Sequence, residues 1–397
     1  MKKSYIQLLL FFLLFHFLFP LICKFIWLED ITIYSDLESS YTGLYVNLFV
    51  LFVVIILINK TKAPDFRLIN PCCSYAHYYY WISFIISIAR FISIGGFEGT
   101  ISGAGSGAIL SYLGIFFQLG YGLFFVILFS KKKININIYV YSYIIAATLM
   151  GSRSAIITLV LLFLYLPFFR NSLLYKEKLQ RNLKLLAIIS PLLFISATLV
   201  RTEINWDFIG RMIVGRISMI EISSIPLDIL DNNDLDQVQF VEKYGLLNQF
   251  EQSINGLLPI DLFKSDVTPN QYYRNIFLGY SEDFVQSIYT SMNLTFPVYW
   301  ILLWGYSFGI IISILLLYIQ YKLLCKFKNN RYLFITTLCL VYEVLYFFDI
   351  PMITQKIFYF SLSYLSLVCV NSFVNKFKKR KIRNERKSAC VGNCSCL

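Results

Sequence analysis

The feature that most constrains this chain is a series of long apolar blocks, separated by short links rich in lysine and arginine. Hydrophobic residues make up 57% of its 397 residues, which leaves too little polar surface to cover a soluble globule. An α-helix needs roughly 20 apolar residues to cross the hydrocarbon of a bilayer, and the chain supplies many such runs. The sequence therefore predicts an all-α polytopic membrane protein.

Ten transmembrane helices are predicted, and the first is a retained span rather than a cleaved signal peptide. The short links and the two ends of the chain hold 25 of the 35 Lys and Arg residues when both termini are placed in the cytoplasm. Net charge +12 would also suit a nucleic-acid partner, but this distribution indicates membrane topology instead. The predicted spans are 5–28, 43–59, 71–94, 108–130, 134–150, 155–169, 185–200, 297–318, 332–348 and 357–374.

Four parts follow from this topology. Residues 1–200 form a membrane domain of seven spans, and 201–296 form one large polar loop on the outer face. Residues 297–375 form a second membrane domain of three spans, and 376–397 form a basic cytoplasmic tail. Tyr78 to Trp81 in the third span are typical of an interfacial aromatic belt.

The outer loop is expected to contain an amphipathic helix from Asp207 to Ser223, with isoleucines along one face. Arg211 falls on the opposite face, where an ion pair with Asp207 is the structural alternative to a functional role. Arg216 falls within the apolar stripe, so it needs a buried anion or must reach lipid phosphate. Gly210 and Gly215 are the points at which this helix could be interrupted.

Other arginines are expected near the same face. Arg153 lies between two serines at the start of span six, where free backbone N–H groups and a guanidinium together suit a phosphate. Arg90 and Arg201 are at similar depths, and a snorkelling arginine at a span end is the alternative for all three.

Acid–base chemistry at this face is expected to use carboxylates. His16 and His77 fall within the first span and near the cytoplasmic end of the third, which excludes them from the outer face. No cluster of metal ligands occurs in the loop sequence, so no metal and no cofactor are predicted. Glu343, inside span nine, implies a partner or a wet cavity, and structural pairing with an arginine from another span is the alternative to a catalytic role. The candidate acids and bases, each alternatively a solvated loop charge, are Glu203, Asp207, Glu221, Glu282 and Asp283.

The layout resembles the O-antigen polymerase (Wzy) family of oligosaccharide repeat unit polymerases. The features that carry the resemblance are Gly151-Ser152-Arg153-Ser154 leading a helix, Gly210-Arg211 and Gly215-Arg216 in one large outer loop, Leu257-Leu258-Pro259, and 293–309 entering the next span. The resemblance implies a GT-C-like glycosyltransferase of the bacterial inner membrane. Its donor and acceptor would be glycans on undecaprenyl pyrophosphate, joined at the periplasmic face, with membrane lipid and a separate chain-length regulator protein as partners.

In that reaction, guanidinium groups would stabilise the departing pyrophosphate without a metal. The expected catalytic residues are Arg153, Arg211, Arg216, Glu203, Asp207 and Glu221. The expected substrate-binding residues are Arg90, Arg201, Arg274, Trp206, Tyr272 and Tyr273, the aromatic ones by stacking on sugar rings. Two alternatives stay open. An O-antigen ligase shares the architecture but uses an outer-face histidine, and a polysaccharide flippase or transporter could use Glu343.

Overall fold

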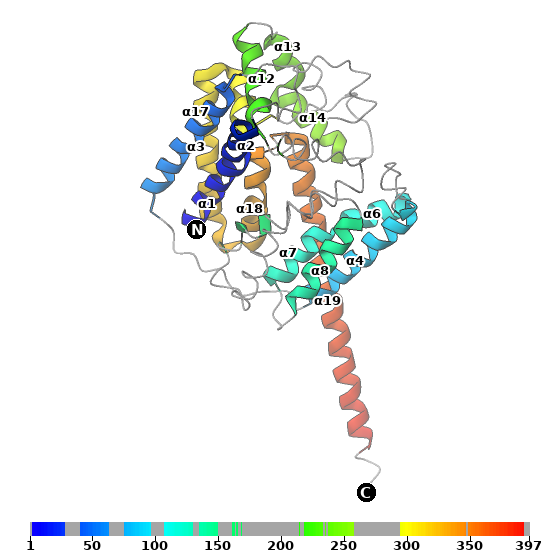
Figure 1. Ribbon diagram of the computed structural model, residues 1–397. Coiled ribbons are helices and arrows are strands. Elements are labelled where there is room, and N and C mark those ends of the chain that lie inside the picture. The colour runs from blue at the N-terminus through cyan, green and yellow to red at the C-terminus, as the bar shows by residue number, and fades with distance from the viewer. Residues whose placement is uncertain are drawn as a thin grey trace. The chain divides into compact units, whose positions relative to one another are not determined.

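The computed structural model consists of helices throughout the part of the chain it describes (Figure 1). The chain divides into two compact units, which we describe separately. Unit 1 comprises Met1–Leu68 and Ile204–Phe358, and unit 2 comprises Ile69–Glu203 and Tyr359–Leu397. The described residues are 2–27, 40–62, 75–96, 107–129, 135–149, 161–162, 164–165, 168, 214, 218–232, 235, 237–257, 294–346 and 348–392.

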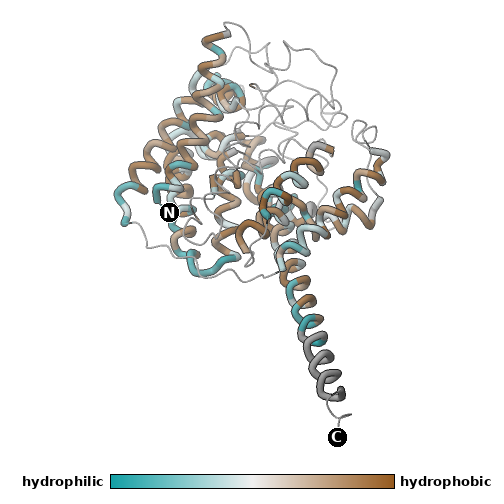
Figure 2. The backbone as a smooth tube through the Cα atoms, turned by 60° about the horizontal axis from the view of Figure 1, so that its bottom comes forward, coloured by the Kyte–Doolittle hydropathy of each residue, from teal (hydrophilic) through white to brown (hydrophobic). Residues whose placement is uncertain are grey.

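Five helices among the described residues are long and apolar enough to cross a membrane. They are Lys2–Ile26, Thr42–Lys60, Ile109–Phe129, Phe296–Asn329 and Ile350–Lys378. Along these helices the hydropathy is mostly high, and hydrophilic residues lie toward helix ends (Figure 2). The prediction of a helical membrane protein is therefore confirmed at this level, while the count of ten spans and the GT-C likeness stay predictions.

Unit 1 is built around α3 (Thr42–Lys60), which packs against α17 (Phe296–Lys326), α12 (Ile220–Asp231) and α1 (Lys2–Leu13). Its other elements are η1 (Leu14–Leu18), α2 (Phe19–Trp27), α13 (Gln237–Tyr244), α14 (Leu246–Leu257), η3 (Phe327–Asn329), α18 (Arg331–Tyr346) and the start of α19 (Ile350–Gly392).

The outward faces of these helices are apolar, as a lipid environment requires. On α17 the exposed side chains are Trp304, Phe308, Ile311, Leu315 and Ile319, three or four residues apart. Polar side chains such as Asn47 and Ser313 lie in the interior instead. Unit 1 thus exposes apolar side chains where a soluble protein exposes polar ones, which supports its placement in a bilayer.

The lysine-bearing helix ends of unit 1 lie together at one end of the unit. Lys2 Nζ donates to the carbonyls of Asn59 and Thr61 at the end of α3, the latter at 3.2 Å. Tyr5 Oη lies 3.4 Å from Gln320 Oε1, and its ring centroid lies 5.3 Å from that of Tyr321 on α17. The N-terminus, the 60–62 link and the last turns of α17 therefore share one end, as the predicted topology requires.

The span predicted over 297–318 lies within α17, but α17 is not a continuous helix. Gly305 has φ +74° and ψ 171°, values suited to glycine, and it folds α17 into two pieces. A Cβ on Gly309 would lie 2.6 Å from the Ile301 Cα, so the two pieces touch backbone to backbone. The first piece, from Phe296 to Leu303, is buried throughout.

In unit 2, α4 (Ala76–Ser93) packs against α6 (Ala108–Phe116), α7 (Leu119–Phe129) and α8 (Ile136–Leu149). The single helix predicted over 108–130 is interrupted at Phe117. Tyr79 Oη donates to the Phe116 carbonyl at 2.9 Å, which satisfies an acceptor freed by the break. Tyr79 and Tyr80 are fully buried, so the predicted interfacial belt is wrong for these two residues.

Candidate functional site

Two of the predicted site residues lie within the described part of the chain, Glu221 in unit 1 and Arg90 in unit 2. The others lie outside the described residues, and their predicted roles stay predictions. They are Arg153, Arg201, Glu203, Trp206, Asp207, Arg211, Arg216, Tyr272, Tyr273 and Arg274. Glu282 and Asp283, weighed as acids or bases, also lie outside.

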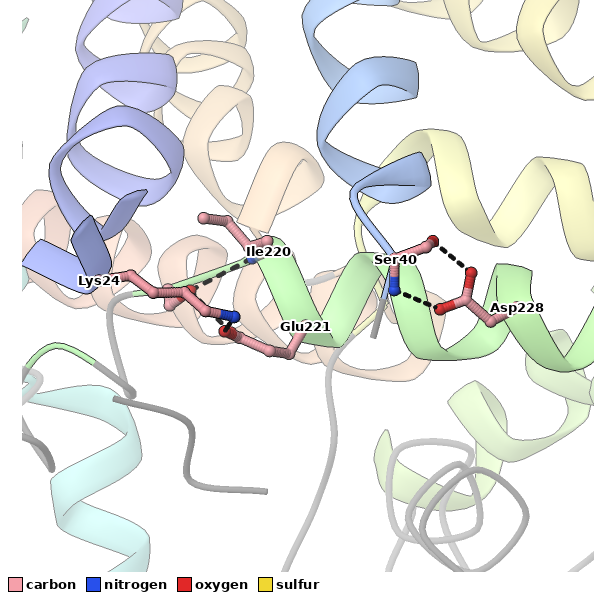
Figure 3. Close-up of polar contacts among 6 residues, drawn as sticks. Lys24, Ser40, Ile220, Glu221 and Asp228 are labelled. Atoms are coloured by element: carbon pink, nitrogen blue, oxygen red, sulfur yellow. Dashed lines mark hydrogen bonds and ion pairs between the residues drawn. The ribbon is translucent and has the colours of Figure 1, made fainter. Parts of the chain in front are cut away.

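Glu221 lies on the first turn of α12 and is buried, with 6% of the residue exposed. Its Oε1 is 3.9 Å from Lys24 Nζ on α2, and its Oε2 accepts a hydrogen bond from Ser218 Oγ at 2.9 Å (Figure 3). Lys24 Nζ also lies 5.7 Å from the Tyr41 ring centroid. The alternative interpretation of Glu221 as a solvated loop charge is therefore wrong.

The predicted amphipathic helix from Asp207 to Ser223 is not continuous. Ser218 N donates to Val214 O at 2.8 Å, as in a helix, but Met219 N donates to His16 O at 3.0 Å. Ser218 Oγ then accepts from Ile220 N at 3.3 Å, and α12 begins there (Figure 3). A bond to η1 thus replaces the local bond at Met219, directly before α12. Residues 207–213 and 215–217 of the predicted helix lie outside the described part of the chain.

A very close approach to α3 fixes the middle of α12. A Cβ on Gly43 would lie 2.3 Å from the carbonyl carbon of Ser223, so only glycine fits. Gly43 N donates to Ser224 Oγ at 3.1 Å. Thr295, which precedes α17, receives hydrogen bonds from Asn47 Nδ2 at 3.2 Å and from Ser223 Oγ at 3.3 Å. These buried contacts hold α12, α3 and α17 together.

The far end of α12 carries two further carboxylates. Asp228 accepts hydrogen bonds from the backbone N–H and the hydroxyl of Ser40, the first at 2.9 Å (Figure 3). Asp231 Oδ2 accepts from Tyr306 Oη at 2.9 Å. Since Ser40 precedes α3 and Lys60 ends it, α12 lies at the end of unit 1 opposite the basic ends.

His16 contacts the same region, which the sequence alone did not indicate. It is 2% exposed within the π-helical turn η1, and its ring Nε2 lies 2.8 Å from Tyr342 Oη on α18. Its carbonyl accepts the hydrogen bond from Met219, three residues after Arg216 in sequence. π-Helical turns often occur at functional sites. The one sequence signal for this contact was a histidine within an otherwise apolar run.

Arg90 lies in the last turn of α4, where the negative end of the helix dipole stabilises its positive charge. Its guanidinium packs directly over Gly114 of α6. A Cβ on Gly114 would lie only 2.7 Å from Arg90 Nη1. The side chain therefore lies against a neighbouring helix, with intermediate exposure.

Glu343 forms an ion pair with Lys356 of α19, and their side chains are 18% and 32% exposed. Glu343 thus has a partner, as expected, although that partner is a lysine rather than an arginine. Among the described residues, no three His, Cys, Asp or Glu side chains gather as a metal ion would require.

No protein-family model, curated protein or solved structure matches this chain. Function must therefore be argued from the residues and the geometry.

Proposed function

We propose that this chain polymerises undecaprenyl-pyrophosphate-linked oligosaccharide repeat units at the periplasmic face of a bacterial inner membrane. The observation that carries the proposal is the packing of α12 against the membrane helices of unit 1. This helix comes from the long polar segment, yet it is buried on α3 and α17 and tied to α2 by Lys24. A polar segment held in this way suits an enzyme whose substrate is anchored in lipid.

The proposed reaction joins two lipid-linked glycans. A hydroxyl of the acceptor glycan attacks the anomeric carbon of the donor, and the bond from that carbon to the phosphate oxygen breaks. Undecaprenyl pyrophosphate leaves with the electron pair, and the hydroxyl proton passes to a carboxylate. Arg153, Arg211 and Arg216 would stabilise the leaving charge, with Arg90, Arg201 and Arg274 binding substrate and Trp206, Tyr272 and Tyr273 stacking on sugars.

Glu221 has a narrower role in this proposal than a general base. Both of its oxygens are already engaged, one by Lys24 and the other by Ser218. We therefore assign Glu221 to positioning α12, and we leave the proton acceptor to Glu203 or Asp207. A chain-length regulator would act as a separate partner.

An O-antigen ligase is the second candidate. That family uses a histidine side chain, whereas His16 bonds to the residue before α12 through its backbone carbonyl, and its buried ring bonds to Tyr342 instead. The two activities differ in what their loss leaves on the cell surface, because a ligase attaches glycan to lipid core and a polymerase lengthens it.

The test is deletion of the gene in its source bacterium, followed by gel analysis of the surface polysaccharide. We expect lipid core bearing a single repeat unit and no ladder. Loss of that single unit as well would overturn the polymerase proposal in favour of a ligase or a flippase.

Point variants then test the arginines. Arg153→Ala and Arg216→Ala should each reproduce the single-repeat pattern at normal protein levels, because the pyrophosphate charge would be left unstabilised. Arg181→Ala is the matched control, since Arg181 lies in a link predicted to be cytoplasmic. A full ladder from both active-site variants would contradict their assignment.

A further inference from the structure

The second half of α19 extends beyond what a bilayer needs. The helix has 43 residues, or about 65 Å at 1.5 Å per residue, roughly twice the thickness of the hydrocarbon. The candidate membrane span on this helix is Ile350–Lys378. From Lys376 to Lys387 the sequence then has eight basic residues and one acidic residue, Glu385. In Figure 2 hydrophilic turns appear between hydrophobic ones toward the far end of the coloured part of this helix.

At this transition two aromatic side chains face outward. Phe373 is 63% exposed and Phe377 is 54% exposed, and their ring centroids lie 4.6 Å apart. They are one turn apart on the helix, so they form a single apolar step beside the charged residues. Lys376, Lys378 and Arg380, interleaved with them, are also exposed.

The start of α4 contributes to the same surface within unit 2. Lys378 Nζ lies 4.6 Å from the centroid of the Tyr75 ring, and the Tyr75 and Tyr78 centroids lie 5.9 Å apart. Tyr78 is 43% exposed. We call this surface the aromatic–basic collar; it comprises Tyr75, Tyr78, Phe373, Lys376, Phe377, Lys378 and Arg380.

We propose that the aromatic–basic collar binds the phosphate headgroups of anionic phospholipids. Aromatic rings with one polar end concentrate at the headgroup level of a bilayer, and lysine or arginine beside them attracts anionic lipid. Nucleic acid would suit the charge alone. Lipid suits the collar better, because its exposed phenylalanines lie at the end of a candidate membrane span, next to the exposed basic residues. The inference does not rest on the proposed function.

The test uses the full-length protein purified in mild detergent. Native mass spectrometry measures how much phosphatidylglycerol, compared with phosphatidylcholine at equal concentration, stays bound. In the collar variant Lys376→Gln/Lys378→Gln/Arg380→Gln, bound phosphatidylglycerol should fall at least tenfold, since each surface charge contributes about fivefold. The matched control, Lys322→Gln/Lys326→Gln/Lys328→Gln, removes the same charge from the basic end of α17 and should keep its lipid.

A second variant guards against misfolding. Lys378→Arg keeps the charge and should retain phosphatidylglycerol, and circular dichroism reports whether each variant keeps its helix content. Equal loss of phosphatidylglycerol from the collar and control variants would overturn the proposal. So would a wild-type protein that retains as much phosphatidylcholine as phosphatidylglycerol. Co-purifying nucleic acid, detected at 260 nm and lost only from the collar variant, would overturn it in favour of a nucleic-acid surface.

Discussion

At the scale of single residues, the contact between Lys24 and Glu221 joins the polar segment to the first membrane helix. Removing one partner of a buried ion pair leaves an uncompensated charge, and that costs about 3–5 kcal/mol when both partners are fully buried. The Glu221 side chain is 8% exposed, whereas the Lys24 side chain is 31% exposed, so water partly screens the pair. The cost here should lie below that range.

We predict that Lys24→Met lowers the free energy of unfolding by about 2 kcal/mol. Thermal unfolding of the detergent-purified protein measures the loss. The double variant Lys24→Met/Glu221→Gln should recover most of it, because no charge is then left unpaired. Lys3→Met is the matched control on the same run of helices, since Lys3 is exposed. Equal effects at Lys24 and Lys3, with no recovery in the double variant, would argue against the pair.

These residues also show what sequence can and cannot supply. Sequence selected Glu221 as a carboxylate of interest, but its partner Lys24 lies 197 positions earlier and no local pattern joins them. His16 was set aside because its position within the first predicted span placed it away from the outer face. The contact between Met219 and His16 arises from the packing of distant segments, which spacing along the chain does not reveal.

At the scale of secondary-structure elements, the apolar runs in the sequence located the described helices well and their interruptions poorly. The predicted spans 43–59 and 332–348 match α3 and α18 to within two residues at either end. The fold in α17 at Gly305 and the break between α6 and α7 were missed. Both interruptions lie inside apolar runs, where hydropathy does not change and only backbone geometry and distant hydrogen bonds differ.

The close contact between α3 and α12 depends on one missing side chain. We predict that Gly43→Ala lowers the free energy of unfolding by about 3 kcal/mol, because its Cβ would meet the Ser223 backbone and α12 would have to shift. Gly107→Ala is the matched control beside the start of α6, with nothing within 4 Å of the added Cβ, and its cost should stay below about 1 kcal/mol. Thermal unfolding of both variants measures the difference. Equal stability of the two would contradict the contact.

At the scale of the whole molecule, the distribution of Lys and Arg predicts which helix ends of unit 1 lie on the same side of the membrane. The lysines at the N-terminus, in the 60–62 link and near the end of α17 were predicted to share the cytoplasmic side, and the structure brings them to one end. Ser40, with its contact to Asp228, lies at the other end. Which end faces the cytoplasm stays a prediction, since it depends on the positive-inside rule.

That prediction can be tested with single cysteines in a variant whose nine native cysteines are replaced by serine or alanine. Lys62→Cys and Lys328→Cys should react with a membrane-impermeant maleimide only after the cells are opened, because a polar link on the cytoplasmic side is shielded by the bilayer. Ser40→Cys should react in intact spheroplasts. Labelling of all three cysteines under denaturing conditions controls for expression. Reaction of Lys62→Cys and Ser40→Cys from the same side would rule out a membrane-crossing α3, and with it the placement of α12 beside a periplasmic substrate.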